Sequence, residues 1–176
     1  MLFLDECEVH LHPQLTKVWT FKGKRPEVPA AGWNRRLCVY GALNFAGGQV
    51  HYTVHPKKNA CQFNGFLRKL LNAKRRRLVV LVLDNASYHK TRETLDILAG
   101  HEDHIMVVWL PTYSPELNAI EGLWGYLKKT ALNNYFFGTP ENLESAIDRA
   151  FAALNSDPAT ALSLAYRTSQ NIAESA

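Results

Sequence analysis

The chain has 176 residues, of which 47% are hydrophobic and 11% aromatic, a composition typical of a globular protein and not of a disordered one. No apolar run approaches the roughly 20 residues that cross a bilayer, and the first residues lack the basic and long apolar segments of a signal peptide. We therefore expect one soluble, cytoplasmic domain over residues 1–176, with a core of about 1–132 and C-terminal helices over about 133–176.

The formal net charge of +4 is unevenly distributed. Residues 1–130 carry 18 Lys and Arg against 11 Asp and Glu, whereas residues 131–176 carry 2 against 5. Basic clusters favour a polyanionic partner such as nucleic acid, although each cluster alone is also compatible with a solvated surface. The clusters lie at residues 22–25, 35–36, 57–58, 68–69, 74–77 and 128–129.

The three cysteines, Cys7, Cys38 and Cys61, are odd in number, widely spaced and without a C-x-x-C pair. This pattern supports neither a disulfide framework nor a thiolate zinc site.

The first third of the chain is predicted to form strands. Extended patterns cover residues 2–6, 17–21, 37–44 and 49–54, and the last two flank a glycine-rich connection suited to a hairpin. An antiparallel arrangement is the simplest that joins them.

Helices and buried strands alternate in the middle of the chain. Apolar residues at helical spacing predict a helix over residues 59–73, and the continuous apolar run at 78–83 predicts a strand in the middle of a sheet. A helix over 91–99, a second buried strand over 105–110 and a helix over about 117–132 follow.

The C-terminal part is predicted to be helical over about residues 140–154 and 158–172, because Thr139 and Asp157 supply caps and a proline opens each first turn. Taken together, the elements predict an α/β fold with helices on both faces of a sheet. The sheet is expected to be mixed and five-stranded, with its first three strands antiparallel, which is one strand fewer than the six extended patterns named above.

Three acidic residues stand where a metal site would need them. Asp5 closes the apolar segment 2–4, Asp84 closes the segment 78–83, and Glu121 lies in the predicted helix that follows. Strand ends gather along one edge of such a sheet, so the three carboxylates are expected to be neighbours. Carboxylates suit hydrated Mg²⁺, and a pair of such ions catalyses phosphoryl transfer.

Each acid also has an ordinary explanation. Asp5 is compatible with a turn, Asp84 with an Asx turn that ends a strand, and Glu121 with a first-turn acid favoured by the helix dipole. Spacing alone does not decide between these alternatives.

Three motifs make the pattern specific. They are F-L-D-E at residues 3–6 with W-T-F-K-G at 19–23, L-D-N-A-S-Y-H at 83–89, and L-P-T-Y-S-P-E-L-N-A-I-E-G-L-W at 110–124. With them, the chain resembles the catalytic region of DDE transposases of the IS630 and Tc1/mariner superfamily, nearest the bacterial IS630 type. The resemblance runs from residue 1 to about 132.

The resemblance implies an RNase H-like fold in which Asp5, Asp84 and Glu121 bind two Mg²⁺ ions, for which Mn²⁺ often substitutes. It further implies cleavage of DNA at transposon ends by metal-activated water, then joining of the freed 3′-hydroxyl to target DNA, typically at a TA dinucleotide. Such proteins usually act as homodimers in a synaptic complex, here in a bacterial, nucleoid-associated setting.

Neighbours of the triad are candidate supporting residues. Glu6 and Asn85 adjoin catalytic positions and are expected to orient ligands or water, His89 to contact a phosphate or water, and Asn118 to lie close by. Structural roles for these residues, including an exposed helix cap for His89, remain alternatives. Trp124 is expected to pack in the core and not to stack on bases.

Two further patterns near the triad have competing interpretations. The alternating Glu8, His10 and His12 resemble zinc ligands, but the stretch follows the first catalytic strand and a structural zinc is not expected. The loop 111–115 beside Glu121 either touches the DNA backbone or sets the entry of the helix.

The basic residues expected to contact phosphates adjoin the predicted catalytic edge. They are Lys22, Lys24, Arg25, Lys128 and Lys129.

Transposases of this type usually carry an N-terminal helix-turn-helix region, which we expect to be absent from this chain. Two alternative functions therefore stay open. One is a catalytically inactive DNA-binding or assembly remnant, and the other is an RNase H-like nuclease or resolvase.

Overall fold

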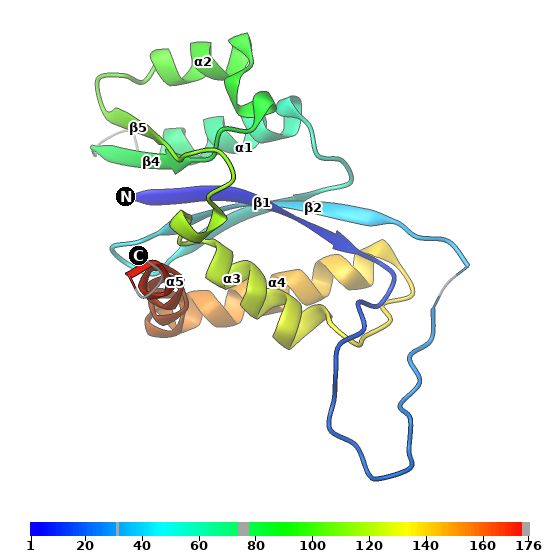
Figure 1. Cartoon of the computed structure of the whole chain (residues 1–176). Helices are drawn as coiled ribbons and strands as arrows, with labels where there is room; N and C mark the ends of the chain where they lie inside the picture. The colour runs from blue at the N-terminus through cyan, green and yellow to red at the C-terminus, as the bar shows by residue number, and fades with distance from the viewer. Residues whose placement is uncertain (31, 74–77, 174–176) are drawn as a thin grey trace.

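The computed structural model describes residues 1–30, 32–73 and 78–173, with side chains described up to residue 166 (Figure 1). The basic run at 74–77 expected from the sequence therefore lies outside the described residues. The strands are β1 (Leu2–His10), β2 (Arg36–Asn44), β3 (Val50–His55), β4 (Val79–Leu83) and β5 (Ile105–Trp109). The α-helices are α1 (Ala60–Ala73), α2 (Arg92–Ala99), α3 (Glu121–Leu127), α4 (Pro140–Ser156) and α5 (Pro158–Ala173).

The five strands form one sheet in the order β3-β2-β1-β4-β5. β1 and β2 pair antiparallel along their whole length, from Leu2 opposite Asn44 to His10 opposite Arg36, and β3 continues the antiparallel part. β4 runs parallel to β1, and β5 parallel to β4. The predicted mixed sheet with three antiparallel strands first is confirmed.

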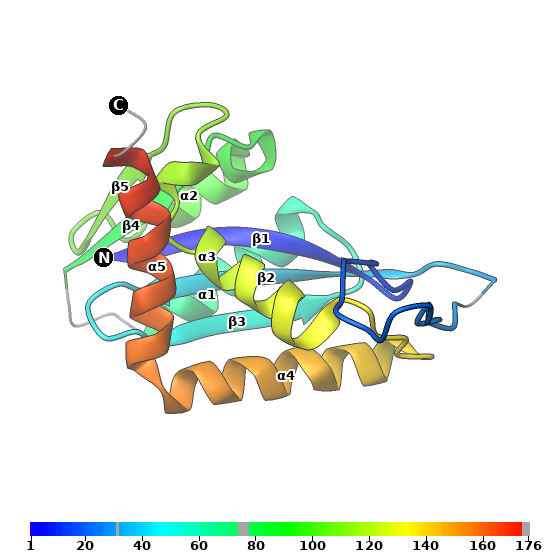
Figure 2. The same cartoon turned by 60° about the horizontal axis from the view of Figure 1, so that its bottom comes forward.

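Helices cover both faces of the sheet (Figures 1 and 2). α1 and α2 pack on one face, and α3, α4 and α5 pack on the other. Successive side chains of a strand point to opposite faces. Leu2 and Leu4 therefore pack in the core beneath α1 and α2, while Cys7 and Val9 pack in the core beneath α3, α4 and α5. The same alternation directs two consecutive acids of β1 to opposite faces of the sheet.

The strand predicted over residues 17–21 is wrong. β1 pairs with β2 and β4, and β2 pairs with β1 and β3. A strand at residues 17–21, between β1 and β2 in the chain, would therefore find no free edge on either of them. Residues 11–30 and 32–35 instead belong to a long loop that projects from the body of the molecule (Figure 1). Trp19 and Phe21 on this loop are 104% and 83% exposed.

The second buried strand predicted over residues 105–110 is only half buried. β5 is an edge strand whose residues alternate, and Met106 and Val108 are 63% and 40% exposed. An apolar run predicts a strand covered on both faces, but one face of this strand is little covered at the sheet edge.

The helix predicted over residues 117–132 is interrupted. A short 3₁₀ turn (Pro115–Leu117) ends at Asn118, whose backbone is extended, and α3 begins only at Glu121. The chain then widens into a π-helical turn (Lys128–Leu132). Glu121 is therefore the first residue of a helix.

Two other helices begin directly after the threonines that cap them. Thr91 caps α2 by accepting from the Thr94 amide, and Thr139 caps α4 by accepting from the Asn142 amide. Among the described residues no helix is long and apolar enough to span a bilayer.

Candidate active site

A pocket of about 340 Å³ brings the three predicted acids together. Asp5, Asp84 and Glu121 all line it, although they come from β1, the end of β4 and the start of α3. The loop between β5 and α3 closes one side through Leu110, Pro111, Thr112, Tyr113, Ser114 and Pro115. The sequence prediction that these carboxylates are neighbours holds in this structure.

Asp5 does not end its strand, contrary to expectation. It lies in the middle of β1 opposite Gly41 of β2. The parallel pairing of β1 with β4, however, stops at Phe3 opposite Val82. Asp5 therefore lies just beyond the point where β4 separates from β1, which leaves it beside Asp84.

The Asp5 carboxylate accepts a hydrogen bond from a core side chain and is largely buried. The indole Nε1 of Trp124 donates a hydrogen bond of 3.0 Å to Asp5 Oδ2. Burial raises the pKa of Asp5 to about 7, and the nearby Glu6 and Glu121 carboxylates add to the rise. Negative charge at this position is therefore disfavoured unless a cation accompanies it.

Asp84 is held by the turn that follows β4. Its Oδ1 accepts a 3.0 Å hydrogen bond from the Ala86 amide, so the Asx turn considered as an alternative is present. The same oxygen lies 2.6 Å from His89 Nδ1. This imidazole, together with the Ala86 amide, holds the pKa of Asp84 below its ordinary value despite partial burial. The turn and a role at the pocket are compatible.

His89 is completely buried beneath the pocket. Its Nε2 lies 3.5 Å from Glu6 Oε2, so the ring forms ion pairs with two carboxylates, those of Asp84 and Glu6. Neither ring N–H points directly at its carboxylate oxygen, so these contacts are not regular hydrogen bonds. Burial alone would lower the pKa of His89, but Asp84 and Glu6 outweigh it and raise the pKa to about 9. The imidazole is sealed from solvent and is neither an exposed cap nor open to a phosphate in this structure.

Glu6 faces the side of the sheet that carries His89. Its carboxylate is 6% exposed and forms an ion pair with Lys58. Burial would raise its pKa, but His89 and Lys58 lower it below the ordinary value. Glu6 is therefore a charged structural partner of His89, one residue from Asp5 but on the opposite face.

Glu121 and two amides complete the pocket. Burial raises the pKa of Glu121, and the positive charge of Lys128, on the π-helical turn after α3, partly counters the rise. Asn118 Nδ2 donates a 3.1 Å hydrogen bond to the Leu4 carbonyl, and Asn85 Nδ2 donates to the Leu110 carbonyl. The Oδ1 atoms of both amides are buried at this pocket and have no hydrogen-bond partner in the described part of the chain.

The donor chemistry of the pocket fits a hard divalent cation. Carboxylate and amide oxygens are ligands that Mg²⁺ and Mn²⁺ accept. Burial first, and neighbouring carboxylates second, raise the pKa values of Asp5 and Glu121, and a bound cation would favour their charged forms. Within the described residues, no group of three or more His, Cys, Asp or Glu side chains converges closely enough to hold one ion.

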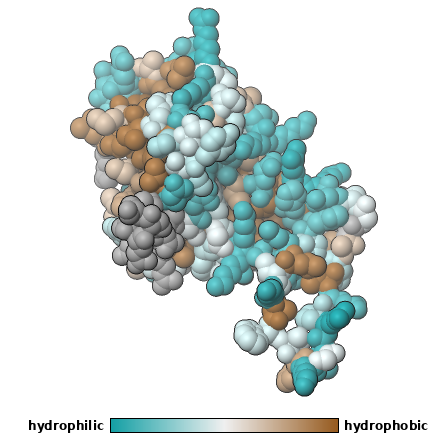
Figure 3. All heavy atoms as spheres, viewed as in Figure 1, coloured by the Kyte–Doolittle hydropathy of each residue, from teal (hydrophilic) through white to brown (hydrophobic). Residues whose placement is uncertain are grey.

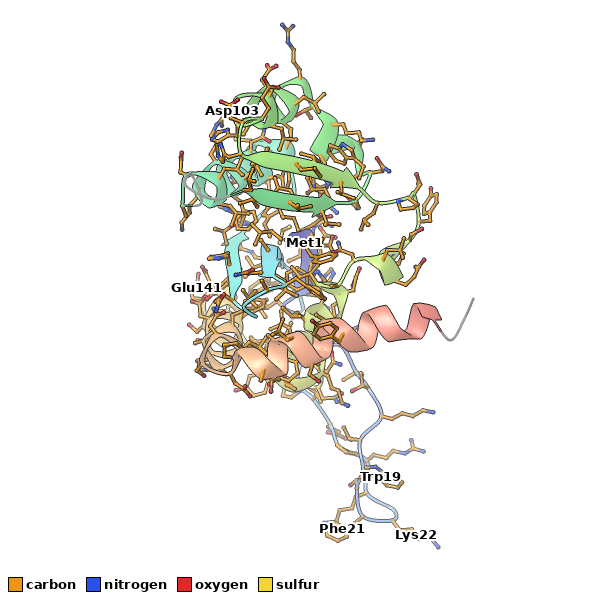
Figure 4. The ribbon with its side chains drawn as sticks, turned by 90° about the vertical axis from the view of Figure 1, so that its left-hand side faces the viewer. Met1, Trp19, Phe21, Lys22, Asp103 and Glu141 are labelled. Carbon is orange, nitrogen blue, oxygen red and sulfur yellow. The ribbon has the colours of Figure 1, made fainter. Side chains whose placement is uncertain are left out.

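The predicted phosphate-binding residues fall into two groups. Lys128 lies close to Glu121, and Lys129 is exposed on the π-helical turn. Lys22, Lys24 and Arg25 are exposed on the projecting loop, with Lys22 at its tip beside Trp19 and Phe21 (Figure 4). This second group does not adjoin the catalytic edge as expected from the sequence.

Sequence reasoning missed two residues that support the pocket. Trp124 packs in the core, as predicted, but its hydrogen bond to Asp5 was not anticipated. Gly41 opposite Asp5 gives this indole its space. A lone glycine inside an apolar strand is the available signal, since it marks a close approach by another group.

The chain matches the family model described as DDE superfamily endonuclease over residues 1–144, and it belongs to that family. It is 31% identical over 136 residues to the insertion element IS630 uncharacterized 39 kDa protein of Shigella sonnei, covering 77% of this chain and 39% of that protein. It is also 31% identical over 88 residues to the uncharacterized protein y4pE/y4sA of Sinorhizobium fredii, covering 50% of this chain and 62% of that protein. The chain thus spans less than two thirds of either relative.

Solved structures of similar fold include the Mos1 mariner paired end complex with Mn, with a TM-score of 0.72 and 20% identity, covering 97% of this chain and 52% of that chain. The Mos1 strand transfer complex follows at a TM-score of 0.68 and 23% identity, covering 97% and 51%. The fold is RNase H-like, as predicted. The resemblance to an IS630/Tc1/mariner DDE transposase catalytic domain is confirmed.

Proposed function

We propose that this chain cleaves DNA at transposon ends and transfers the freed strand into target DNA, using divalent cations held by Asp5, Asp84 and Glu121. The observation that carries the proposal is that these three carboxylates, from three separate parts of the chain, line one pocket. Mg²⁺ is the expected ion and Mn²⁺ its substitute, with two ions bound. Membership in the DDE endonuclease family supports this proposal.

The residues around the pocket have separate tasks in this proposal. Asp5 and Asp84 present carboxylates from rigid backbone, and Glu121 adds a third from the start of α3. A divalent ion held there would stabilise the negative charge that develops on phosphate oxygens during phosphoryl transfer. The buried Oδ1 atoms of Asn85 and Asn118 would orient water or an ion ligand at the pocket wall.

DNA is the proposed partner, with transposon ends and a TA target. The solved neighbours are a paired end complex and a strand transfer complex, which supports a paired-end assembly, and the homodimer is our proposal for this chain. Lys128 beside the pocket is the proposed contact for a phosphate near the cleaved bond, and Lys129 for one further along the duplex.

The test is metal-dependent nicking of supercoiled plasmid, with joining of a 3′-hydroxyl oligonucleotide as the second readout. We expect activity in Mg²⁺ or Mn²⁺ and a loss on the order of 1000-fold or more in Asp84→Asn and Glu121→Gln, because each removes a charged ligand of the reaction centre. The exposed acid Asp103, remote from the pocket, provides the matched control Asp103→Asn (Figure 4). Equal nicking by the wild type and Asp84→Asn would refute the proposal, and so would DNA binding with no metal-dependent cleavage.

A further inference from the structure

The indole of Trp124 lies between the core and the pocket. Its ring is 2% exposed and packs edge-on against Phe151 of α4 at 6.1 Å between ring centroids. Its only polar atom, Nε1, donates to Asp5 Oδ2 at 3.0 Å. The side chain is therefore fixed by apolar packing while its one donor is directed at a carboxylate of the proposed reaction centre.

The space for this ring comes from Gly41. A Cβ atom at position 41 would lie 2.6 Å from Trp124 Cη2, closer than real contacts allow, and 3.1 Å from Cζ2, which is an unusually tight contact. It would also lie 3.2 Å from a methyl group of Ile120. Because Gly41 is the β2 partner of Asp5, the absence of a side chain there lets the indole reach across β2 to the neighbouring carboxylate.

The hydrogen bond also fixes the orientation of the Asp5 carboxylate. An N–H donor on Oδ2 restricts rotation of the carboxylate, and Oδ1 is then presented in a constant direction. Outer groups that hold a ligand in this way are usually worth about 10–100-fold in metal affinity. A phenylalanine would keep an aromatic ring in the core, although a smaller one, and would lose the donor, so the packing loss needs a control of its own.

We propose that Trp124 is a positioning residue of the reaction centre, which orients the Asp5 carboxylate for a divalent cation through its indole N–H, and that Gly41 is the residue that permits this contact. The inference rests on the proposed role of Asp5 as a metal ligand. Trp124 does not touch the substrate and acts only through Asp5.

The test measures Mn²⁺ affinity by calorimetry and by electron paramagnetic resonance of the full chain, alongside thermal unfolding. We expect Trp124→Phe and Gly41→Ala each to bind Mn²⁺ roughly 10-fold more weakly than the wild type, or weaker still. Phe151→Leu is the matched control, because it disturbs the same core next to Trp124 without altering a polar group at the pocket. It should stay within about 2-fold of the wild type at a comparable loss of thermal stability.

The outcomes separate the inference from the proposed function. If the wild type binds no Mn²⁺, the proposed function fails. If the wild type binds Mn²⁺ and Trp124→Phe binds it equally well, or if Phe151→Leu loses as much affinity as Trp124→Phe, only the positioning role is overturned.

A spectroscopic measurement that leaves Trp124 in place covers the case in which Trp124→Phe does not fold. The chain has four tryptophans and therefore four indole N–H resonances in a ¹⁵N–¹H spectrum. One of them should shift in Asp5→Asn, and the same one should shift when Mg²⁺ is added. If no indole resonance responds to both changes, Trp124 does not act through Asp5.

Discussion

The surroundings of Asp5 oppose its ionisation. Burial is the main cause, and the Glu6 and Glu121 carboxylates add to it, so the pKa rises from 3.8 to about 7. The folded chain then holds a proton at Asp5 more tightly than the unfolded chain does. Stability contributed in this way is complete below about pH 4 and is lost as the pH rises toward about 7.

We predict that Asp5→Asn stabilises the metal-free protein at pH 8, because the amide removes a charge that is disfavoured there. About three pKa units correspond to about 4 kcal/mol at most, and partial solvent screening reduces the expected gain to on the order of 2 kcal/mol. Urea unfolding at pH 4, 6 and 8 should show the gain growing with pH.

The control for this prediction is Asp103→Asn, which replaces an exposed acid away from the pocket (Figure 4). Addition of Mg²⁺ at pH 8 should stabilise the wild type more than Asp5→Asn. A gain in Asp5→Asn that is larger at pH 4 than at pH 8 would contradict the assignment of Asp5 as the acid whose ionisation is opposed.

At the scale of elements, the free edge of β3 is closed at one point by α4. The Val50 amide donates to Asn155 Oδ1 at 2.7 Å, and Asn155 Nδ2 donates to the Val50 carbonyl at 3.0 Å. The side-chain amide thereby replaces the neighbouring strand that β3 lacks. This pair of hydrogen bonds ties the end of α4 to the edge of the sheet.

We predict that Asn155→Ala lowers the free energy of unfolding by about 1–3 kcal/mol, because two partly buried backbone groups lose their partners. Asn155→Asp keeps the acceptor for the Val50 amide but faces the Val50 carbonyl with a second oxygen, so a similar loss is expected.

Ser156→Ala is the control for this prediction. Ser156 donates to the Ala153 carbonyl at an exposed position, and its replacement should cost under about 0.5 kcal/mol. Urea unfolding measures all three variants. Equal stability of Asn155→Ala and the wild type would show that water replaces Asn155 at no cost.

At the scale of the whole molecule, the projecting loop is the feature least tied to the body. It mixes hydrophobic and hydrophilic side chains (Figure 3), and Trp19, Phe21 and Lys22 lie together at its tip (Figure 4). A backbone hydrogen bond from Asn134 to the Gln14 carbonyl, with bonds between the Asn134 side chain and Thr16, secures the base of the loop. The side chains at the tip project away from the core.

We predict that replacing Lys22, Lys24 and Arg25 together by alanine weakens DNA binding without changing the thermal midpoint, because all three are exposed. The slope of log affinity against log salt should fall by about 0.9 for each duplex phosphate that the variant no longer neutralises. Titration of a fluorescent duplex between about 50 and 200 mM salt measures this slope.

A charge-matched control replaces Lys57, Lys69 and Arg92, three basic residues at the surface outside the loop. It should leave the salt slope closer to that of the wild type. An unchanged slope in the loop variant would remove these residues from the DNA interface.

Local patterns in the sequence were enough to predict most elements. Helical spacing of Phe63, Phe66, Leu67 and Leu70 placed α1, and continuous apolar residues placed β4, because burial of one face or of both leaves a periodic record along the chain. Residues 17–21 misled the same reasoning, since a short run of residues that favour strands does not show whether a partner strand has a free edge.

The sequence by itself predicted a mixed sheet with an antiparallel start, the family and three candidate acids, because these depend on short-range periodicity and on contiguous motifs. Only the tertiary structure decided that Asp5 lies within a strand, that His89 is buried between Glu6 and Asp84, and that Trp124 reaches Asp5 across 119 positions of sequence. These contacts depend on how the two cores pack against the sheet. Such contacts between distant residues require side chains that fit together in the core, as the Trp124 ring fits beside Gly41. In the sequence, the only sign of this fit is one glycine within an apolar segment.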